Sequence, residues 1–264
     1  MSLEVALTLS MAIAGLAGVI TGAEGFVGRS ELSCNGLLNV KTIRTGRALI
    51  PRLAPPLRWA PAISLGYIGF SLAILISLVG NWGALRDMAL LGLAACVVLQ
   101  AGSMPYGRDG ADEMSVVIVV PLAAVALLGQ SSRALEIAFL FIACQLSLSY
   151  LAAGIAKACG RYWRDGSALL RIAQTFSYGE PRLARGLQRF PLIGRAATRA
   201  VVVWELLVPA AILVGGPAVV LVLSVGAFFH VANAWVMGLN RFLLWFLAAY
   251  PAALFVALRF GLWS

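Results

Sequence analysis

The stretch Val201–Phe229, VVVWELLVPAAILVGGPAVVLVLSVGAFF, decides the fold class of this chain. It belongs to two apolar runs, about 197–214 and 217–238, and each run is close to the roughly 20 residues that a helix needs to cross the hydrocarbon core of a bilayer. Gly215-Gly216-Pro217 separates them and is a strong turn signal. We therefore expect two membrane-spanning helices here, joined by a tight turn.

The whole chain has the same character. Of its 264 residues, 61% are hydrophobic and 12% are charged, whereas about 25% are charged in soluble domains. The apolar runs recur along the full length, which neither a signal peptide nor a single anchor explains. We predict an all-α, polytopic transmembrane helix bundle in a lipid bilayer, forming one domain over residues 1–264. The eight expected spans are about 5–22, 59–79, 85–104, 114–131, 134–158, 197–214, 217–238 and 241–260.

Two long polar connections, about 23–58 and 159–196, carry most of the basic residues. Both follow odd-numbered spans, so both are expected on one side of the membrane. The positive-inside rule places that side in the cytoplasm and both termini outside. In the second connection, Ser167–Phe176 has apolar residues at helical spacing and predicts a short interfacial helix. Lipid headgroups and cytoplasmic loops explain the net charge of +9, so no nucleic-acid partner is predicted.

Several classes of site are absent from the sequence. Its four cysteines form no CxxC pair and no cluster with histidine, so neither a disulfide framework nor a metal site is predicted. P-loop, HExxH and GxSxG motifs are also missing. The turn at Met104–Met114 contains three acidic residues without the spacing of a calcium loop, and we interpret it as an acidic turn or as a clamp for the basic connections.

Ionisable residues within apolar spans are the first candidates for function, because placing them in lipid is costly. Lys157 lies near the end of the fifth expected span, on the helical face of Tyr150 and Gly154. Its amine could reach the headgroups by snorkelling. Alternatively it acts as a general base, because burial disfavours the charged form of an amine.

Two further groups stand in apolar surroundings. His230, the only histidine, has Asn233 one turn later on its face. A neutral imidazole there could be a satisfied structural group or could bind a carbonyl or phenol-type oxygen of a ligand. Glu205 is expected to pair with Lys157 or an arginine, or to take part in proton transfer.

These residues resemble the vitamin K-dependent γ-carboxylase superfamily and its small bacterial HTTM relatives, which include sporulation-delaying protein B-like proteins. The first matching patch is Tyr150, Gly154 and Lys157 followed by Trp163-Arg-Asp-Gly166. The second is Phe229-His230-Val-Ala-Asn233, followed by Gly238 and Phe242. Glu205 and the Asp109–Met114 turn match less specifically. The resemblance covers about residues 60–264.

The resemblance implies an integral membrane enzyme of the bacterial cytoplasmic (inner) membrane. Its cofactors would be a reduced quinone (menaquinol or a vitamin K hydroquinone-like ring) and O2, with CO2 if carboxylation is retained. By this resemblance Lys157 and His230 are catalytic, and the quinol or substrate is bound by Tyr150, Gly154, Trp163, Asn233, Glu205 and Trp204. The oxygenated quinol would act as a strong base on a peptide or small substrate, in carboxylation or related maturation chemistry, with a partner subunit presenting the peptide.

Two other classes fit the same composition. A DoxX-like membrane subunit of a quinone-linked redox complex would need the intramembrane glutamate but not the lysine. A non-enzymatic transporter, immunity protein or scaffold would need neither, although the chain shows no internal repeat of the kind common in transporters.

Overall fold

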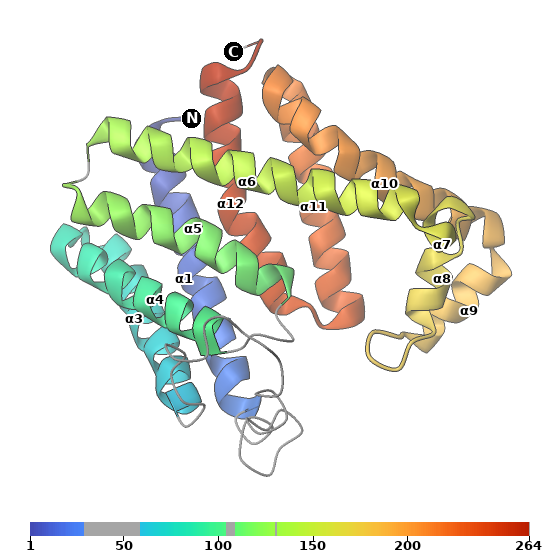
Figure 1. The fold of residues 1–264 in the computed structure, drawn as a ribbon, viewed down its shortest axis with the longest axis horizontal. Helices are drawn as coiled ribbons and strands as arrows, with labels where there is room; N and C mark the ends of the chain where they lie inside the picture. Colours follow the sequence, from blue (N-terminus) through green and yellow to red (C-terminus); the bar gives the residue numbers. More distant parts are fainter. Residues whose placement is uncertain (29–58, 104–108, 130, 264) are drawn as a thin grey trace. The chain divides into compact units, whose positions relative to one another are not determined.

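The computed structural model describes residues 1–28, 59–103, 109–129 and 131–263, and these residues form helices without any strand (Figure 1). Eight of the described helices are long and apolar enough to cross a membrane. They are α1 (Leu3–Val27), α3 (Ala60–Gly80), α4 (Gly83–Ser103), α5 (Gly110–Leu127), α6 (Ser132–Cys159), α10 (Pro191–Val214), α11 (Gly216–Met237) and α12 (Asn240–Phe260). The all-α bundle with eight spans is confirmed, and the chain is a multi-pass membrane protein.

Helix boundaries depart from the apolar runs where polar residues start a helix. Helix α5 begins four residues earlier than expected, because the Asp109 side chain accepts hydrogen bonds from the backbone N–H groups of Ala111 and Asp112. The Asp112 carboxylate in turn accepts from Asp109 N, which completes a capping box. Two carboxylates of the acidic turn therefore start a helix. Residues 29–58 of the first basic connection lie outside the described residues.

The second basic connection folds into three short helices, α7 (Arg161–Arg164), α8 (Ala168–Ala173) and α9 (Pro181–Arg189). Helix α8 lies within the interfacial helix expected at 167–176 and is shorter. Helix α9 was not predicted, although Glu180 caps it by accepting from Leu183 N and Pro181 occupies its first turn. Helix α10 begins at Pro191, six residues before the expected span, with the proline in its first turn.

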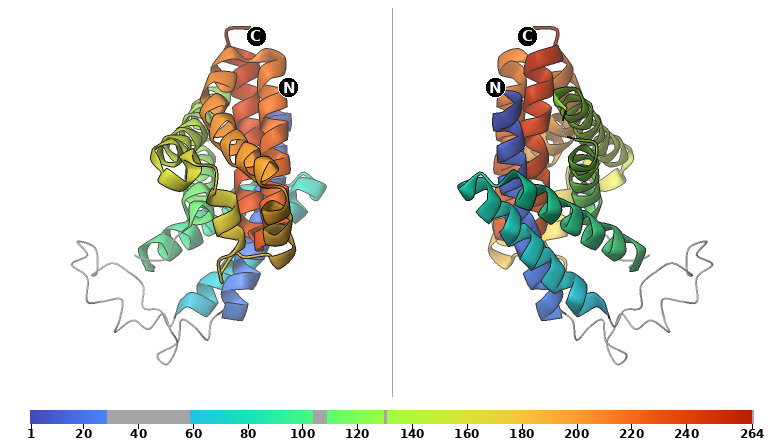
Figure 2. Two further views of the ribbon diagram at one scale, coloured as in Figure 1. Left: turned by 90° about the vertical axis from the view of Figure 1, so that its right-hand side faces the viewer. Right: turned by 90° about the vertical axis from the view of Figure 1, so that its left-hand side faces the viewer.

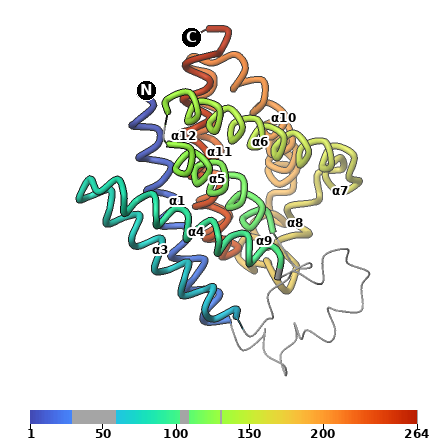
Figure 3. The backbone as a smooth tube through the Cα atoms, turned by 60° about the vertical axis from the view of Figure 1, so that its left-hand side comes forward, coloured from blue at the N-terminus to red at the C-terminus, as the bar shows by residue number. Residues whose placement is uncertain are grey.

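The described chain divides into two compact units. The N-terminal unit comprises residues 2–138 and 244–251, and the C-terminal unit comprises residues 139–243 and 252–264. In the N-terminal unit, α1 packs on α3, α3 on α4 and α4 on α5. Figure 3 shows α3 and α4 side by side. The buried Trp245 indole N–H donates to Thr21 Oγ1 at 3.0 Å, which ties residues 244–251 to α1.

The C-terminal unit is built around α10 and α11. Gly215 joins them with φ 77°, and a Cβ there would lie 2.5 Å from the carbonyl oxygen of Ala257. The glycine turn expected from the sequence is thus required by both conformation and space. Helices α7, α8 and α9 contact α10 and gather around its N-terminal part (Figure 2). Every residue predicted as part of the site belongs to this unit.

Candidate functional site

Helix α6 presents Tyr150, Gly154 and Lys157 on one face, as the spacing predicts, and this face meets α10. A Cβ added to Gly154 would lie 2.9 Å from Leu206 Cδ2 and 3.2 Å from Glu205 Cβ. Such distances are shorter than ordinary carbon contacts. The missing side chain of Gly154 therefore lets the two helices approach closely enough for side chains one turn away to meet.

Lys157 and Glu205 form a bidentate ion pair across this contact. Lys157 Nζ donates to Glu205 Oε1 at 2.6 Å and to Oε2 at 2.8 Å. The glutamate side chain is 5% exposed and the lysine side chain 23% exposed. Of the roles open to Glu205, pairing with Lys157 is the one that the structure shows. Two opposite charges held together in apolar surroundings are the costly kind of pair that membrane proteins place at functional positions.

Trp163 covers the ammonium end of this pair. Lys157 Nζ lies 5.3 Å from the centre of the Trp163 ring, within the range of a cation–π contact. Helix α7 carries the indole, and the turn after it is anchored to α10, because Thr198 Oγ1 donates to the carbonyl oxygen of Gly166 at 3.2 Å. The lysine is thus held by Glu205 and Trp163, an arrangement different from free snorkelling into headgroups.

Tyr150 and His230 form a second polar pair. The Tyr150 hydroxyl lies 2.6 Å from His230 Nε2, and the two residues are 3% and 1% exposed. The sequence left two roles open for this imidazole, a satisfied structural group or a binder of a ligand oxygen, and the structure shows its Nε2 paired with the phenol of Tyr150 in the same chain. The pair joins α6 to α11 within the C-terminal unit.

Aromatic rings surround this second pair. Trp204 lies edge-on to Tyr150, with ring centres 5.0 Å apart, and its indole N–H donates to the carbonyl oxygen of Val222 at 2.9 Å. Phe229 and Phe242 lie 5.5 Å and 5.2 Å from His230, measured between ring centres. These two phenylalanines were not among the residues predicted for the site, although both occur in the segment that resembles the γ-carboxylase superfamily.

The predicted residues therefore gather in two neighbouring groups on α6 and α10. The ion-pair group is Lys157, Glu205 and Trp163, and the ring group is Tyr150, His230 and Trp204 with the two phenylalanines. Trp204 and Glu205 are consecutive in the chain and link the groups. Asn233 lies one turn after His230 on α11 and is half-buried. Among the described residues, no three His, Cys, Asp or Glu side chains come together as a metal site would require.

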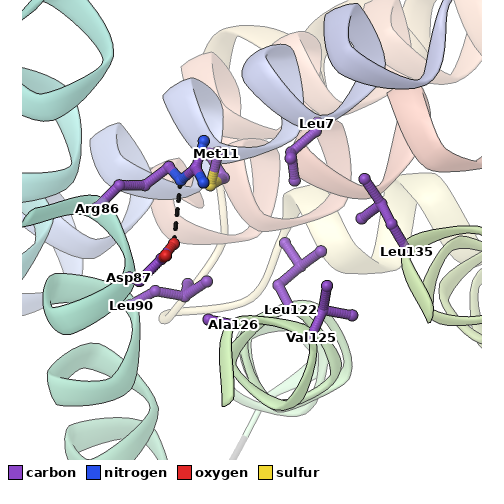
Figure 4. A pocket seen from close by; sticks show the side chains of 9 residues that line it. All are labelled: Leu7, Met11, Arg86, Asp87, Leu90, Leu122, Val125, Ala126 and Leu135. Atoms are coloured by element: carbon purple, nitrogen blue, oxygen red, sulfur yellow. Dashed lines mark hydrogen bonds and ion pairs between the residues drawn. The ribbon is translucent and has the colours of Figure 1, made fainter. Parts of the chain in front are cut away.

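The N-terminal unit contains a pocket, and its lining residues belong to other parts of the sequence than the two groups do. Figure 4 shows the Arg86–Asp87 ion pair beside it and apolar side chains such as Met11 and Leu122 around it. None of the residues predicted for the site lines this pocket.

Comparison with protein-family models, with curated proteins and with solved structures found no match.

Proposed function

We propose that the chain is an intramembrane enzyme of the bacterial cytoplasmic membrane that takes a proton from a reduced quinone. The observation that carries the proposal is the Lys157–Glu205 pair, with Nζ 2.6 Å and 2.8 Å from the two carboxylate oxygens. A buried acid–base pair of this kind can move a proton within itself, and a neutral amine can then act as a general base.

The side chains suit the two chemical features of a quinol, its aromatic ring and its hydroxyl groups. A quinol is a flat aromatic ring, and the ring group offers aromatic faces and edges around the Tyr150–His230 hydrogen bond. A quinol also carries hydroxyl groups, and both the imidazole and the phenol can exchange hydrogen bonds with them. The proton acceptor is available on the same face of α6, seven residues after Tyr150.

The ion pair determines how a proton would be accepted. A lysine ammonium has no lone pair, so it cannot act as a base while it carries all its protons. Lys157 can first pass a proton to Glu205, which leaves an amine beside a carboxylic acid. The amine then accepts the hydroxyl proton of the quinol and becomes an ammonium again. The pair has then gained one proton, and the quinol has lost one.

The surroundings assist this transfer. Trp163, which belongs to the second basic connection, lies over the ammonium and limits the access of water to it. When bound, a deprotonated quinol supplies the chemistry with O2 that the resemblance implies, forming a strong base for modification of a peptide or small substrate, with CO2 as the co-substrate of a carboxylation. Tyr150 and His230 are assigned to orient the ring.

The test is quinol turnover by the purified protein in nanodiscs. Menaquinol and oxygen are supplied, and the oxidised product is followed by mass spectrometry. Lys157→Ala should abolish turnover. The chain has one other lysine, Lys41 in the first basic connection, and Lys41→Ala is the matched control that should turn over normally. Equal turnover by wild type and Lys157→Ala would reject the proposal. Normal turnover by Lys157→Met alongside a co-purifying soluble redox protein would instead support the DoxX-like subunit.

A further inference from the structure

The segment from Arg161 to Arg199, which comprises the second basic connection and the first turns of α10, is the most basic described part of the chain. It holds eight arginines and no lysine, against the carboxylates of Asp165 and Glu180, so its net charge is +6. The whole chain carries +9. All eight arginines are exposed. Two thirds of the net positive charge therefore belongs to this exposed segment, made of α7, α8, α9 and the start of α10.

Helix α9 shows how this surface is oriented. Arg182, Arg185 and Arg189 share one face, because their spacing of three and four residues returns to the same side of a helix. The opposite face carries the buried Ala184 and also Leu187, which lies 3.3 Å from the position of a Cβ on Gly194 of α10. The apolar face of α9 is thus used for packing, and the arginine face is left outward.

The ends of the connection fix where the surface can lie. It begins directly after α6 and returns to the membrane through α10, so it stays close to one membrane surface. Large apolar side chains on it are exposed: Phe176 is fully exposed and Phe190 is 52% exposed. Arg171 stacks on the Tyr162 ring, with its guanidinium carbon 3.9 Å from the ring centre. Aromatic rings interleaved with cations are typical of the boundary between headgroups and acyl chains.

We propose that this arginine surface binds the phosphate headgroups of an anionic phospholipid leaflet. Guanidinium groups suit phosphate better than ammonium groups do, because they offer two parallel N–H donors to two phosphate oxygens. The exclusive use of arginine fits that chemistry. The inference is independent of the proposed enzymatic activity, since it concerns none of the residues assigned to proton transfer.

The test uses the full-length protein in micelles and native mass spectrometry. Phosphatidylglycerol and phosphatidylcholine with identical acyl chains are titrated in turn, and the apparent affinity for each is measured. Wild type should bind phosphatidylglycerol more tightly, and less so as salt is raised. Each arginine near an anionic surface strengthens binding by about five-fold. The double variant Arg182→Gln/Arg189→Gln should therefore lose up to about 25-fold for phosphatidylglycerol and little for phosphatidylcholine.

Two arginines elsewhere provide a charge-matched control. Arg133 and Arg259 are exposed on α6 and α12, and Arg133→Gln/Arg259→Gln should keep the wild-type preference. Thermal unfolding of both variants checks that the fold is intact. Equal affinity of wild type for the two lipids would overturn the proposal, as would an equal loss in the control. Binding of a polyglutamate peptide that depends on Arg182 and Arg189, without any lipid preference, would identify an acidic protein partner instead.

Discussion

Replacing Lys157 by methionine should destabilise the protein more than replacing its partner does. Methionine is unbranched and one atom shorter than lysine, and it leaves the carboxylate of Glu205, only 5% exposed, without its counter-ion. Removing one partner of a buried pair costs about 3–5 kcal/mol. Glu205→Leu leaves the ammonium instead, and Lys157 is 23% exposed, so its amine can turn outward and the cost should be smaller, about 1–2 kcal/mol.

A double variant distinguishes the interaction energy of the pair from the other effects of each substitution. Replacing both members of a buried ion pair by apolar side chains is often neutral or stabilising, so Lys157→Met/Glu205→Leu should be more stable than Lys157→Met alone. The assay is reversible unfolding of the purified variants in mixed micelles, with helix content followed by circular dichroism. A coupling energy of at least about 1.5 kcal/mol between the two substitutions is expected. Additive effects, with a double variant less stable than either single variant, would refute the reasoning.

Three further changes test the geometry around the pair. Gly154→Val should separate α6 from α10 and lower both stability and turnover, whereas Gly69→Val, where a Cβ meets nothing within 4 Å, should do neither in the same two assays. Tyr150→Phe should cost about 1–3 kcal/mol of unfolding free energy, because it leaves a buried imidazole nitrogen without its phenol. Hydrogen bonds from Ser167, followed by the charges of nearby arginines, hold the pKa of Asp165 below its usual value. The ionised carboxylate of Asp165 should stabilise the turn between α7 and α8 near neutral pH, and this stabilisation should disappear as the pH falls through the lowered pKa. Amide exchange at Ser167 should therefore differ between wild type and Asp165→Ala only at the higher pH.

The apolar runs were sufficient to predict the fold class, because burial in lipid requires about 20 apolar residues per span wherever the helix packs. Polar helices give no such signal. Helix α9 was missed for that reason, although Glu180 and Pro181 are recognisable start signals.

The candidate site was only partly predictable. Helical spacing placed Tyr150, Gly154 and Lys157 on one face because that relation is local. The partner of Lys157 stayed open, since Glu205 lies 48 residues further along the chain and the contact depends on how α6 and α10 pack. The same holds for Tyr150 and His230, which are 80 residues apart. A sequence pattern identifies the ionisable side chains whose burial in a membrane costs free energy, and tertiary packing decides which of them come into contact.

The central claim is that Lys157 and Glu205 act together as the acceptor of a quinol proton, and a mutant cycle on quinol turnover tests it most directly. Turnover is measured in nanodiscs for wild type, Lys157→Ala, Glu205→Gln and the double variant. The account predicts that each single change causes a severe loss and that the double variant is no slower than Lys157→Ala, because groups that act as a unit are not additive. Wild-type turnover in Lys157→Ala, or losses that simply multiply in the double variant, would contradict it.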